Sequence, residues 1–587
     1  MEMHALGVMQ SLTGRRWTWR PGAEERLGQR LAQELDLPEL MGRLLASRGV
    51  TVEDAPAFLD PTLRALLPDP SSIIDMDAAA TRLAEAVMAG EPVGVFGDYD
   101  VDGACSAALL VSLLRELGCT VYYHVPDRIL EGYGPNSEAL RAMAERGARV
   151  LVCVDCGTAG HEAFAPLHNM ADIVVLDHHK AEGAPLPIRA LVNPNRLECR
   201  SGLTHICAAG VTFLTCVALV RVLRKRGFFA GRREPDLLSY LDLVALATIC
   251  DVMPLTGLNR AFVTQGLRVM ARRARPGIAA LLDVAKLGEA PTAMNCGFSL
   301  GPRINAAGRI AQADMGLRLL LAGDAALAAE LAQTLDEVNK QRQLVEAEVS
   351  GQAMAMAEAQ LEAGHSVLLL AQEGWHPGVV GIVAGRMKEK FNRPALVAGI
   401  TDGYAKGSGR SVPGVDLGGA IIAARQSGLL ATGGGHPMAA GFSLRAEALE
   451  PFHAFLEERL QTGTLPMSAE LVVDGLLGLA GADTTLAQLV ARLGPFGNGN
   501  AEPLFVLPRA RVVRAGRIGK DGGTIRAMVE GEGGGRLKAL LFRAKDGPLA
   551  AALENPGAPL HLAGHLRAES WQGRVSAGFF ITDAAPA

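Results

Sequence analysis

Strand and helix patterns alternate through the first half of this chain, and this alternation restricts the fold more than any other feature. Short apolar runs occur at residues 93–96 (VGVF), 120–125 (TVYYHV), 149–154 (RVLVCV) and 172–176 (DIVVL), and amphipathic stretches separate them. Buried strands that alternate with helices form parallel sheets, because a crossover helix must return the chain to the same edge. Residues 85–324 are therefore predicted to form an α/β domain with a doubly wound parallel sheet.

The rest of the chain is predicted to form four further segments. Residues 1–84 have helical periodicity without strand signals. Residues 325–363 contain no proline and one glycine, which predicts one long helix that connects two lobes. Residues 364–465 form a second α/β pattern, with strands predicted in SVLLLAQ and PALVAGI. After a break near Gly463–Pro466, residues 468–587 alternate short strands with Gly-rich turns, as a small β-barrel does.

Acidic and histidine side chains follow four separate apolar elements, each at its carboxyl end. Three of these elements are the predicted strands that end at residues 96, 154 and 176, and the fourth is the apolar run YLDLVALATIC. The carboxyl edge of an open α/β sheet is where ligands bind, so these side chains are expected to converge. They are Asp98, Asp100, Asp102, Asp155, Asp177, His178, His179 and Asp251.

Convergent carboxylates repel one another, and their pKa values rise unless a cation neutralises them. Carboxylate and imidazole groups suit Mg²⁺ or Mn²⁺, and two such ions about 3.5–4 Å apart can cleave phosphate esters. Each element alone is also consistent with an ordinary turn or helix cap; the argument depends on all four occupying the same edge. Cys153 and Cys156 form a C-x-x-C pair, which leaves redox chemistry or zinc binding as a weaker alternative.

Composition limits where the protein acts and what it binds. The net charge of −5 excludes a uniformly basic coat, so a site for a polyanion must be local. The apolar stretch from Ile206 to Val220 is shorter than the roughly 20 residues that cross a bilayer, which predicts a buried helix and no membrane partner. The first residues lack the apolar core of a secretory signal, and nine scattered cysteines favour a reduced, cytoplasmic protein.

Several sequence motifs resemble those of a known family. GDYDVDG, VDCG, DHH and ATICDVMPL are similar to the four phosphoesterase motifs of the DHH superfamily. GPRINAAGRI, WHPGVVGIVAGR, SGRS and GGGHPMAAGF resemble its associated C-terminal domain. With FLDP near the start and LGPFGNGNAEPLF near the end, nearly the whole chain resembles the RecJ family of bacterial single-strand-specific 5′→3′ DNA exonucleases.

The resemblance implies roles for the acidic and histidine residues. It implies two bound ions, Mn²⁺ or Mg²⁺, and it implies that Asp155 bridges them. The implied ligands are Asp100, Asp102, Asp155, His178 and Asp251. Catalytic or supporting roles are implied for Asp98, Asp177 and His179, with His179 near the scissile phosphate. Many relatives have a histidine four residues before the aspartate that Asp100 matches, whereas this chain has Phe96, so one ion is expected to be held by fewer ligands.

A nucleic-acid path is implied by further motif residues. Arg128 matches an arginine that such enzymes use near a terminal phosphate, and Ser408 with Arg410 could reach the same phosphate from the second lobe. The glycine-rich segment could offer backbone N–H groups to a phosphate as a turn does. The implied substrate-binding residues are Arg128, Arg303, Asn305, Arg309, Ser408, Arg410, Gly434, Gly435 and His436.

The last segment carries its own charge signal. Residues 505–575 contain 12 lysine or arginine residues and six acidic residues, which gives a local charge of 12 − 6 = +6 in an acidic protein. This count includes Lys520 and Asp521. With aromatic residues such as Phe542 and Trp571, the segment suits an OB-fold that follows a single strand, although a solubilising surface is an alternative.

The sequence thus predicts a metal-dependent exonuclease that hydrolyses single-stranded DNA to 5′-mononucleotides in recombination and repair. Two alternatives are another phosphodiesterase of the superfamily, acting on oligoribonucleotides or cyclic dinucleotides, and a binding protein that lost the chemistry. The helical N-terminal segment and the basic barrel speak against the first, and the complete set of motif aspartates speaks against the second. The resemblance further implies a single-strand-binding protein and a helicase as partners.

Overall fold

The computed structural model of the 587-residue chain describes residues 4–21, 25–128, 130–180, 186–288, 290–460, 469–519, 522–555, 557–571 and 574–587, with the backbone alone at residues 570 and 571. Two compact units are present. The first comprises Met1–Gly308, Gln312–Asp336 and Glu470–Ala587, and the second Arg309–Ala311 and Glu337–Ala469. Lys520, Asp521, the Trp571 side chain and the predicted break at Gly463–Pro466 lie outside the described residues.

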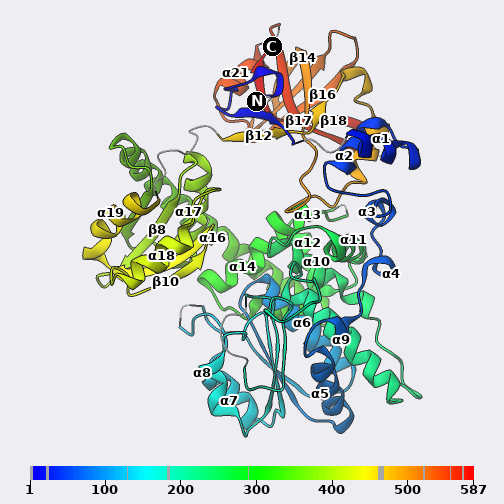
Figure 1. Ribbon diagram of the computed structural model, residues 1–587, viewed down its shortest axis with the longest axis vertical. Coiled ribbons are helices and arrows are strands. Elements are labelled where there is room, and N and C mark those ends of the chain that lie inside the picture. Colours follow the sequence, from blue (N-terminus) through cyan, green and yellow to red (C-terminus); the bar gives the residue numbers. More distant parts are fainter. Residues whose placement is uncertain are drawn as a thin grey trace. The chain divides into compact units, whose positions relative to one another are not determined.

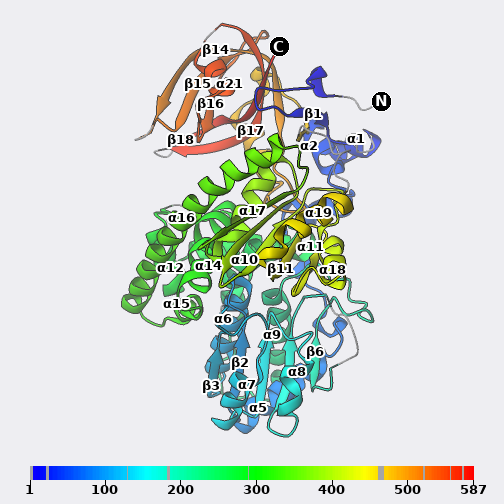
Figure 2. The same cartoon turned by 90° about the vertical axis from the view of Figure 1, so that its left-hand side faces the viewer.

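A five-stranded, fully parallel sheet forms the centre of the α/β part of the first unit (Figure 1). Its strands are β2 (Val93–Gly97), β3 (Val121–His124), β4 (Val150–Val154), β5 (Asp172–Leu176) and β6 (Ala190–Val192). The order is β3-β2-β4-β5-β6, so β3 and β6 are the edge strands (Figure 2). The predicted doubly wound sheet is therefore confirmed, and β6 is a strand that the sequence pattern did not indicate.

Helices cover both faces of this sheet because its strands are apolar on both sides. One face carries Leu151 and Cys153 of β4, which lie in one apolar cluster with Leu140 and Met143 of α7. Helices α6 and α9 pack against the sheet as well. The bounds are α5 (Met76–Ala89), α6 (Val101–Glu116), α7 (Ser137–Glu145), α8 (His161–Phe164) and α9 (Ala208–Lys225). The stretch predicted as a buried helix is α9, and among the described residues no helix is long and apolar enough to span a membrane.

A helical layer follows the sheet in sequence. Its members are α10 (Leu241–Cys250), α11 (Gly257–Ala271), α12 (Pro276–Val284), α13 (Ala293–Asn295), α14 (Gly301–Ile310) and α15 (Met315–Leu321). The apolar run that ends in Asp251 is thus a buried helix, α10, whereas the other three acidic motifs follow strands. The long helix predicted at 325–363 is α16 (Ala325–Glu362).

The N-terminal segment contains a strand, which contradicts the prediction of helix alone. β1 (Arg16–Trp19) pairs in parallel with β12 (Glu470–Val473), and the indole of Trp17 donates to Asp583 at 2.9 Å. Local periodicity could not reveal a four-residue strand whose partner lies about 450 positions away in the chain. The helices of this segment are α1 (Glu25–Glu34), α2 (Glu39–Ala46), α3 (Ala55–Leu59) and α4 (Leu63–Leu66), and residues of α1 and α2 share an apolar core with the C-terminal barrel.

The C-terminal part of the first unit is a closed five-stranded barrel, as predicted. Hydrogen bonding runs in a ring through β14, β15, β16, β18 and β17 and returns to β14, while β13 adds to β14 outside the ring. The bounds are β13 (Gly475–Leu476), α20 (Thr484–Ala491), β14 (Phe505–Ile518), β15 (Thr524–Glu530), β16 (Arg536–Phe542), α21 (Pro548–Glu554), β17 (Pro559–Trp571) and β18 (Arg574–Pro586).

The second unit is a mixed sheet of order β10-β11-β9-β8-β7, in which only β7 and β8 are parallel. Both strands predicted here, β7 and β8, are present. The bounds are β7 (Leu368–Glu373), α17 (Pro377–Phe391), β8 (Ala395–Thr401), β9 (Tyr404–Arg410), α18 (Leu417–Gln426), β10 (Thr432–His436), β11 (Ala439–Arg445) and α19 (Leu449–Leu460).

The close packing of α10 on α11 yields a stability prediction. A Cβ at Gly266 of α11 would lie 2.1 Å from the Leu241 carbonyl oxygen and 2.4 Å from the Ala245 Cβ of α10. Gly266→Ala should therefore lower the free energy of unfolding of the first unit by about 1–3 kcal/mol. Thermal unfolding measures it, with Gly351→Ala as control, because a Cβ at Gly351 of α16 meets nothing within 4 Å and should stabilise slightly. Equal thermal unfolding midpoints for the two variants would contradict the close packing of α10 on α11.

Candidate metal centre

The order of the parallel strands places two aspartates at the point where the winding of the sheet reverses. After β2 the chain crosses to β3 on one side, and it then returns to build β4, β5 and β6 on the other side, so the switch point lies between β2 and β4. Asp98 directly follows β2 and Asp155 directly follows β4. In doubly wound sheets this crevice is the ligand site.

Asp155 has an unusual backbone conformation that fixes its direction. Its φ is 61°, in the left-handed region, while its N–H continues the sheet ladder by donating to Leu176 O at 3.0 Å. Non-glycine residues in this region are uncommon and cluster at functional sites. The next strand end is fixed in the same way, since Asp177 N–H donates to Val192 O at 3.1 Å.

Two of the three aspartates of the first motif, Asp100 and Asp102, are held by helix N-termini. Asp100 caps α6, and its Oδ1 accepts from the backbone N–H of Asp102 at 2.9 Å and of Gly103 at 3.1 Å. The Asp102 carboxylate accepts from Ala208 N–H at 2.7 Å and Ala209 N–H at 2.8 Å, the first residues of α9. Helix N-termini favour negative charge, so both carboxylates are partly compensated and rigidly placed.

Asp177 has no oxygen left for a further ligand. Its Oδ2 accepts from the backbone and hydroxyl of Thr158 at 3.0 and 2.6 Å, and its Oδ1 accepts from the His179 ring at 2.7 Å. Burial would raise the pKa of Asp177, but these hydrogen bonds hold it below its usual range. Burial lowers the pKa of His179, yet the hydrogen bond and charge of Asp177 outweigh it and raise that pKa to about 9. His179 is therefore a protonated imidazole at neutral pH.

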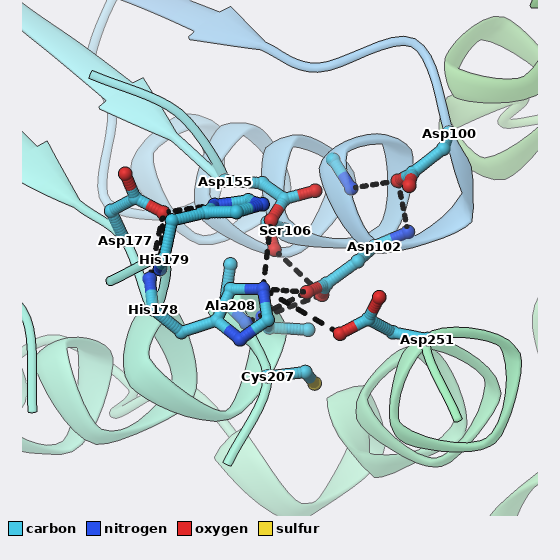
Figure 3. Close-up of polar contacts among 12 residues, drawn as sticks. Asp100, Asp102, Ser106, Asp155, Asp177, His178, His179, Cys207, Ala208 and Asp251 are labelled. Atoms are coloured by element: carbon cyan, nitrogen blue, oxygen red, sulfur yellow. Dashed lines mark hydrogen bonds and ion pairs between the residues drawn. The ribbon is translucent and has the colours of Figure 1, made fainter. Parts of the chain in front are cut away.

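His178 lies among three carboxylates (Figure 3). Its Nε2 is 3.4 Å from Asp155 Oδ1, 3.5 Å from Asp251 Oδ2 and 3.7 Å from Asp102 Oδ2. Burial lowers the pKa of His178 although the charge of Asp102 opposes this, so the ring is neutral and can act as a ligand. Ligand atoms around one ion at 2.1 Å are about 3 Å apart, close to these separations.

Three buried carboxylate oxygens in this crevice have no hydrogen-bond partner among the described residues: Asp98 Oδ1, Asp155 Oδ1 and Asp251 Oδ2. Burial, followed by the charge of Asp100, raises the pKa of Asp98 to about 8. Burial, followed by the charge of Asp102, raises the pKa of Asp251 to about 8, and the same causes raise that of Asp155. Unpaired buried carboxylates are costly, and bound divalent cations would compensate the charge of all three.

The side chains form three overlapping groups that could hold ions. They are Asp98, Asp100 and Asp155; Asp102, His178 and Asp251; and Asp155, His178 and His179, with the ligand atoms of each group within 4.8 Å of one another. Asp155 thus belongs both to the group that contains Asp98 and to a group that contains His178. Because the His179 ring is protonated, it cannot act as a ligand, whereas the oxygen donors and the single imidazole of the first two groups fit Mg²⁺ or Mn²⁺.

The structure gives no support to the cysteine alternative. No candidate ligand group among the described residues contains a cysteine, and all nine thiols are free. Burial raises the pKa of both Cys153 and Cys156, so neither is a thiolate. Phe96, where many superfamily relatives have histidine, is fully buried in the apolar cluster beside α7 and supplies no ligand.

Four predicted substrate residues lie on α14 or near the sheet edge. In the first unit, the Arg128 guanidinium lies 5.0 Å from the centre of the Tyr99 ring. Arg303 is engaged in the scaffold, since it pairs with Asp336 at 2.8 Å and donates to Ser299 O. Asn305 is half-buried on the same helix. In the second unit, Arg309 donates to Gly378 O at 2.8 Å.

The other predicted substrate residues lie on two strands of the second unit. Ser408 and Arg410 are on β9, where the guanidinium donates to the Ser408 hydroxyl at 2.8 Å. Gly434, Gly435 and His436 belong to β10, an edge strand paired with β11 on one side only. The expected glycine-rich turn is therefore a strand, because its backbone pairs along its length with residues 439–443.

Sequence reasoning missed the residues that support the histidines. Asn193 donates to Thr158 Oγ1 and to His179 O, both at 2.8 Å, and Asn195 donates to His178 O at 2.6 Å. These asparagines follow β6, so a strand-end signal existed, but the three-residue strand was too short to recognise. The Tyr133 hydroxyl lies 3.2 Å from the His179 ring nitrogens, and nothing in the local sequence pattern indicates this contact.

Comparisons with known proteins show which proteins this chain resembles. Family models match residues 92–248 (DHH family, N-terminal domain), 364–462 (DHHA1 domain) and 473–583 (RecJ OB domain). The single-stranded-DNA-specific exonuclease RecJ of Escherichia coli K12 is 36% identical over 86% of this chain and 88% of its own length. That of Bacillus subtilis 168 is 34% identical over 94% of this chain and 69% of its own length. The crystal structure of RecJ from Thermus thermophilus in complex with Mn²⁺ has a TM-score of 0.79 and 30% identity, covering 96% of this chain and 78% of that one.

The raised pKa values predict how stability depends on pH when divalent ions are chelated. A carboxyl whose pKa rises from 3.8 to about 8 on folding binds more protons in the folded state, so its contribution to stability falls as pH rises through that range. The unfolding midpoint of the chelated protein should therefore fall between pH 5 and pH 8, and Asp98→Asn should reduce the fall. Excess Mn²⁺ should flatten the curve. A midpoint independent of pH in chelator would contradict the uncompensated carboxylates.

Proposed function

This chain belongs to the RecJ family, and we propose that it is a divalent-metal-dependent exonuclease that degrades single-stranded DNA 5′→3′ to 5′-mononucleotides. The observation that carries the proposal is the set of three buried carboxylate oxygens, on Asp98, Asp155 and Asp251, that have no hydrogen-bond partner among the described residues. Those of Asp155 and Asp251 lie 3.4 and 3.5 Å from Nε2 of the neutral His178 imidazole. Such a set can hold two cations and is suited to hydrolysing phosphodiesters.

The ligand groups suggest how two ions would be held. Asp98, Asp100 and Asp155 would bind one ion, and Asp102, His178 and Asp251 would bind the other, with Asp155 between them. Asp98 is thereby proposed as a ligand as well as a support. When bound, the ions would lower the pKa of a water molecule and neutralise charge on phosphoryl oxygens.

His179 is the group proposed to act on the substrate directly. Its side chain is 44% exposed, whereas the Asp177 that holds it is buried. Because its pKa is raised to about 9, it would present a positive charge to a phosphoryl oxygen as negative charge develops in the transition state. Tyr133 lies against the same ring and limits how far it can turn.

The barrel surface supports binding of a single strand. Five of its cations are already paired with acids: Arg509, Arg517, Arg536, Lys538 and Arg567. Among the described barrel residues, six cations have no ion pair: Arg511, Arg514, Arg526, Arg543, Lys545 and Arg574. Two adjoining hollows of about 430 and 1060 Å³ share Ile518, Arg526 and Lys538, and the larger also reaches the half-exposed Phe542. Cationic grooves with exposed aromatic rings bind single-stranded nucleic acid.

The direction of digestion requires a group that reads one strand end. We propose Arg128 in the first unit as one phosphate-binding group and Ser408 with Arg410 in the second unit as another, since forked guanidinium donors match phosphate oxygens. A cytoplasmic location is proposed because all nine thiols are free, as is usual in reducing compartments. A single-strand-binding protein and a helicase are proposed as partners, which co-purification tests.

The first functional prediction concerns Asp155. Asp155→Ala should reduce cleavage at least about 100-fold, because one side chain serves both ions, while the protein stays folded and still binds single-stranded DNA. End-labelled single-stranded DNA, duplex and a dinucleotide, each with Mn²⁺ or chelator, provide the measurement. A 5′ label should appear first as mononucleotide. Glu138→Ala, an exposed carboxylate of α7, is the control, and more than about a tenth of the wild-type rate in Asp155→Ala would rule out the central role.

The second functional prediction separates stacking from charge on the barrel. Phe542→Ala should weaken binding of single-stranded DNA about 5- to 150-fold with an unchanged salt dependence, since a ring carries no charge. Arg526→Ala should lower the slope of log affinity against log salt by about 0.7, one phosphate contact. Arg509→Ala, whose partner is Glu532, is the matched control. Wild-type slopes and affinities in both test variants would exclude this face of the barrel as the binding site for single-stranded DNA.

A further inference from the structure

A loop that precedes the barrel strand β14 contacts the turn that follows Asp251. Residues 493–500 connect α20 to the segment before β14, and they lie in the same unit as the metal centre. The contacted turn, residues 252–255, follows Asp251 at the end of α10. No role for this contact follows from the ligand set or from the barrel surface.

Asn498 holds both ends of this turn. Its side-chain amide donates to Val252 O at 2.7 Å, and its backbone carbonyl accepts from Leu255 N–H at 2.7 Å. From the opposite side, the buried Asn259 donates to Pro254 O at 3.0 Å. Three of the four residues after the proposed ligand therefore form hydrogen bonds with two other elements.

Val252, the residue directly after Asp251, has a strained backbone. Its φ is 56°, and its side chain is 64% exposed, so packing of the side chain does not hold this conformation. A β-branched residue in the left-handed region is an outlier that persists only where surrounding contacts enforce it. The end of α10 supplies such contacts, because Val252 N–H donates to Ile249 O and Met253 N–H donates to Thr248 O, both at 3.1 Å, as in other helix ends with a left-handed residue. The hydrogen bond from Asn498 to the Val252 carbonyl adds to them.

Two glycines allow the loop to approach this closely. A Cβ at Gly499 would lie 2.9 Å from Pro254 Cβ, and a Cβ at Gly497 would lie 2.9 Å from Leu255 Cδ1. Gly499 also has a φ of 71°, which favours glycine. The G-N-G spacing around Asn498 is thus explained by contact with the turn rather than by the barrel.

The loop is itself rigid, so it can act as a support. Asn500 is buried, and its amide donates to Leu493 O and Pro495 O, both at 2.8 Å. Its side-chain oxygen accepts from Arg48 Nε at 3.0 Å, which ties the loop to the N-terminal segment.

We propose that Asn498 is a positioning residue of the metal centre. Together with the hydrogen bonds at the end of α10, it holds the turn that follows Asp251, and the placement of this turn keeps Asp251 Oδ2 near His178 Nε2, 3.5 Å away. The inference rests on the proposed function, because Asn498 would act on the ion that Asp102, His178 and Asp251 are proposed to bind. The loop of residues 493–500 would thus contribute to metal binding.

Calorimetric titration of the full chain with Mn²⁺, without DNA, tests the proposal. Asn498→Ala should weaken binding of the ion that Asp251 is proposed to hold by about 10-fold, the usual effect of losing a residue that orients a metal ligand. Adding Val252→Gly should recover most of this loss, because glycine adopts a positive φ without strain. Gln488→Ala is the control, since this exposed amide of α20 has no hydrogen-bond partner among the described residues.

The outcomes are distinct. Mn²⁺ affinity within about twofold of wild type in Asn498→Ala, with or without a lower unfolding midpoint, would overturn the proposal and leave a structural contact. A loss that Val252→Gly does not recover would overturn the role of the strained turn. If wild type binds Mn²⁺ with the predicted dependence on Asn498 but does not cleave single-stranded DNA, the proposed function fails and this inference stands. If wild type binds no Mn²⁺, both fail.

Discussion

Repulsion among buried carboxylates is the constraint on which the rest of this structure depends. Asp98, Asp155 and Asp251 each direct an unpartnered oxygen into one crevice, and burial together with neighbouring charge raises the pKa of all three. In the absence of a cation this arrangement opposes folding. The scaffold must therefore place the carboxylates firmly enough that binding of cations, rather than movement apart, relieves the repulsion.

The scaffold achieves this with contacts from many parts of the first unit. Helix N-termini hold Asp100 and Asp102, while Thr158 and the asparagines after β6 hold Asp177 and the two histidines. Asp155 is aimed by a left-handed backbone within a sheet ladder. The Asp251 turn is held by Asn498 of the loop that leads to the barrel. The loop that leads to the barrel and the turn that follows Asp251 are thereby in direct contact.

The sequence was sufficient to predict the parallel sheet, the long helix α16, the barrel and the convergence of eight acidic and histidine residues. These features arise from periodicity and from the position of polar residues at the ends of apolar runs, which are local signals. It did not predict β1, whose partner strand is about 450 residues away, or Asn498, whose partner turn is 246 positions away. Nor did it show that Asp177 is saturated by hydrogen bonds and that Asp98 has a free oxygen, because such distinctions depend on tertiary contacts.

Anomalous diffraction from crystals grown with Mn²⁺ tests the central claim most directly. The account predicts two peaks about 3.5–4 Å apart, each about 2.0–2.4 Å from its ligand atoms. One peak should contact Asp98, Asp100 and Asp155, and the other Asp102, His178 and Asp251, with Asp155 reaching both. A single peak, or a peak pair without Asp155 between them, would contradict the claim that these carboxylates are arranged to be neutralised by two ions.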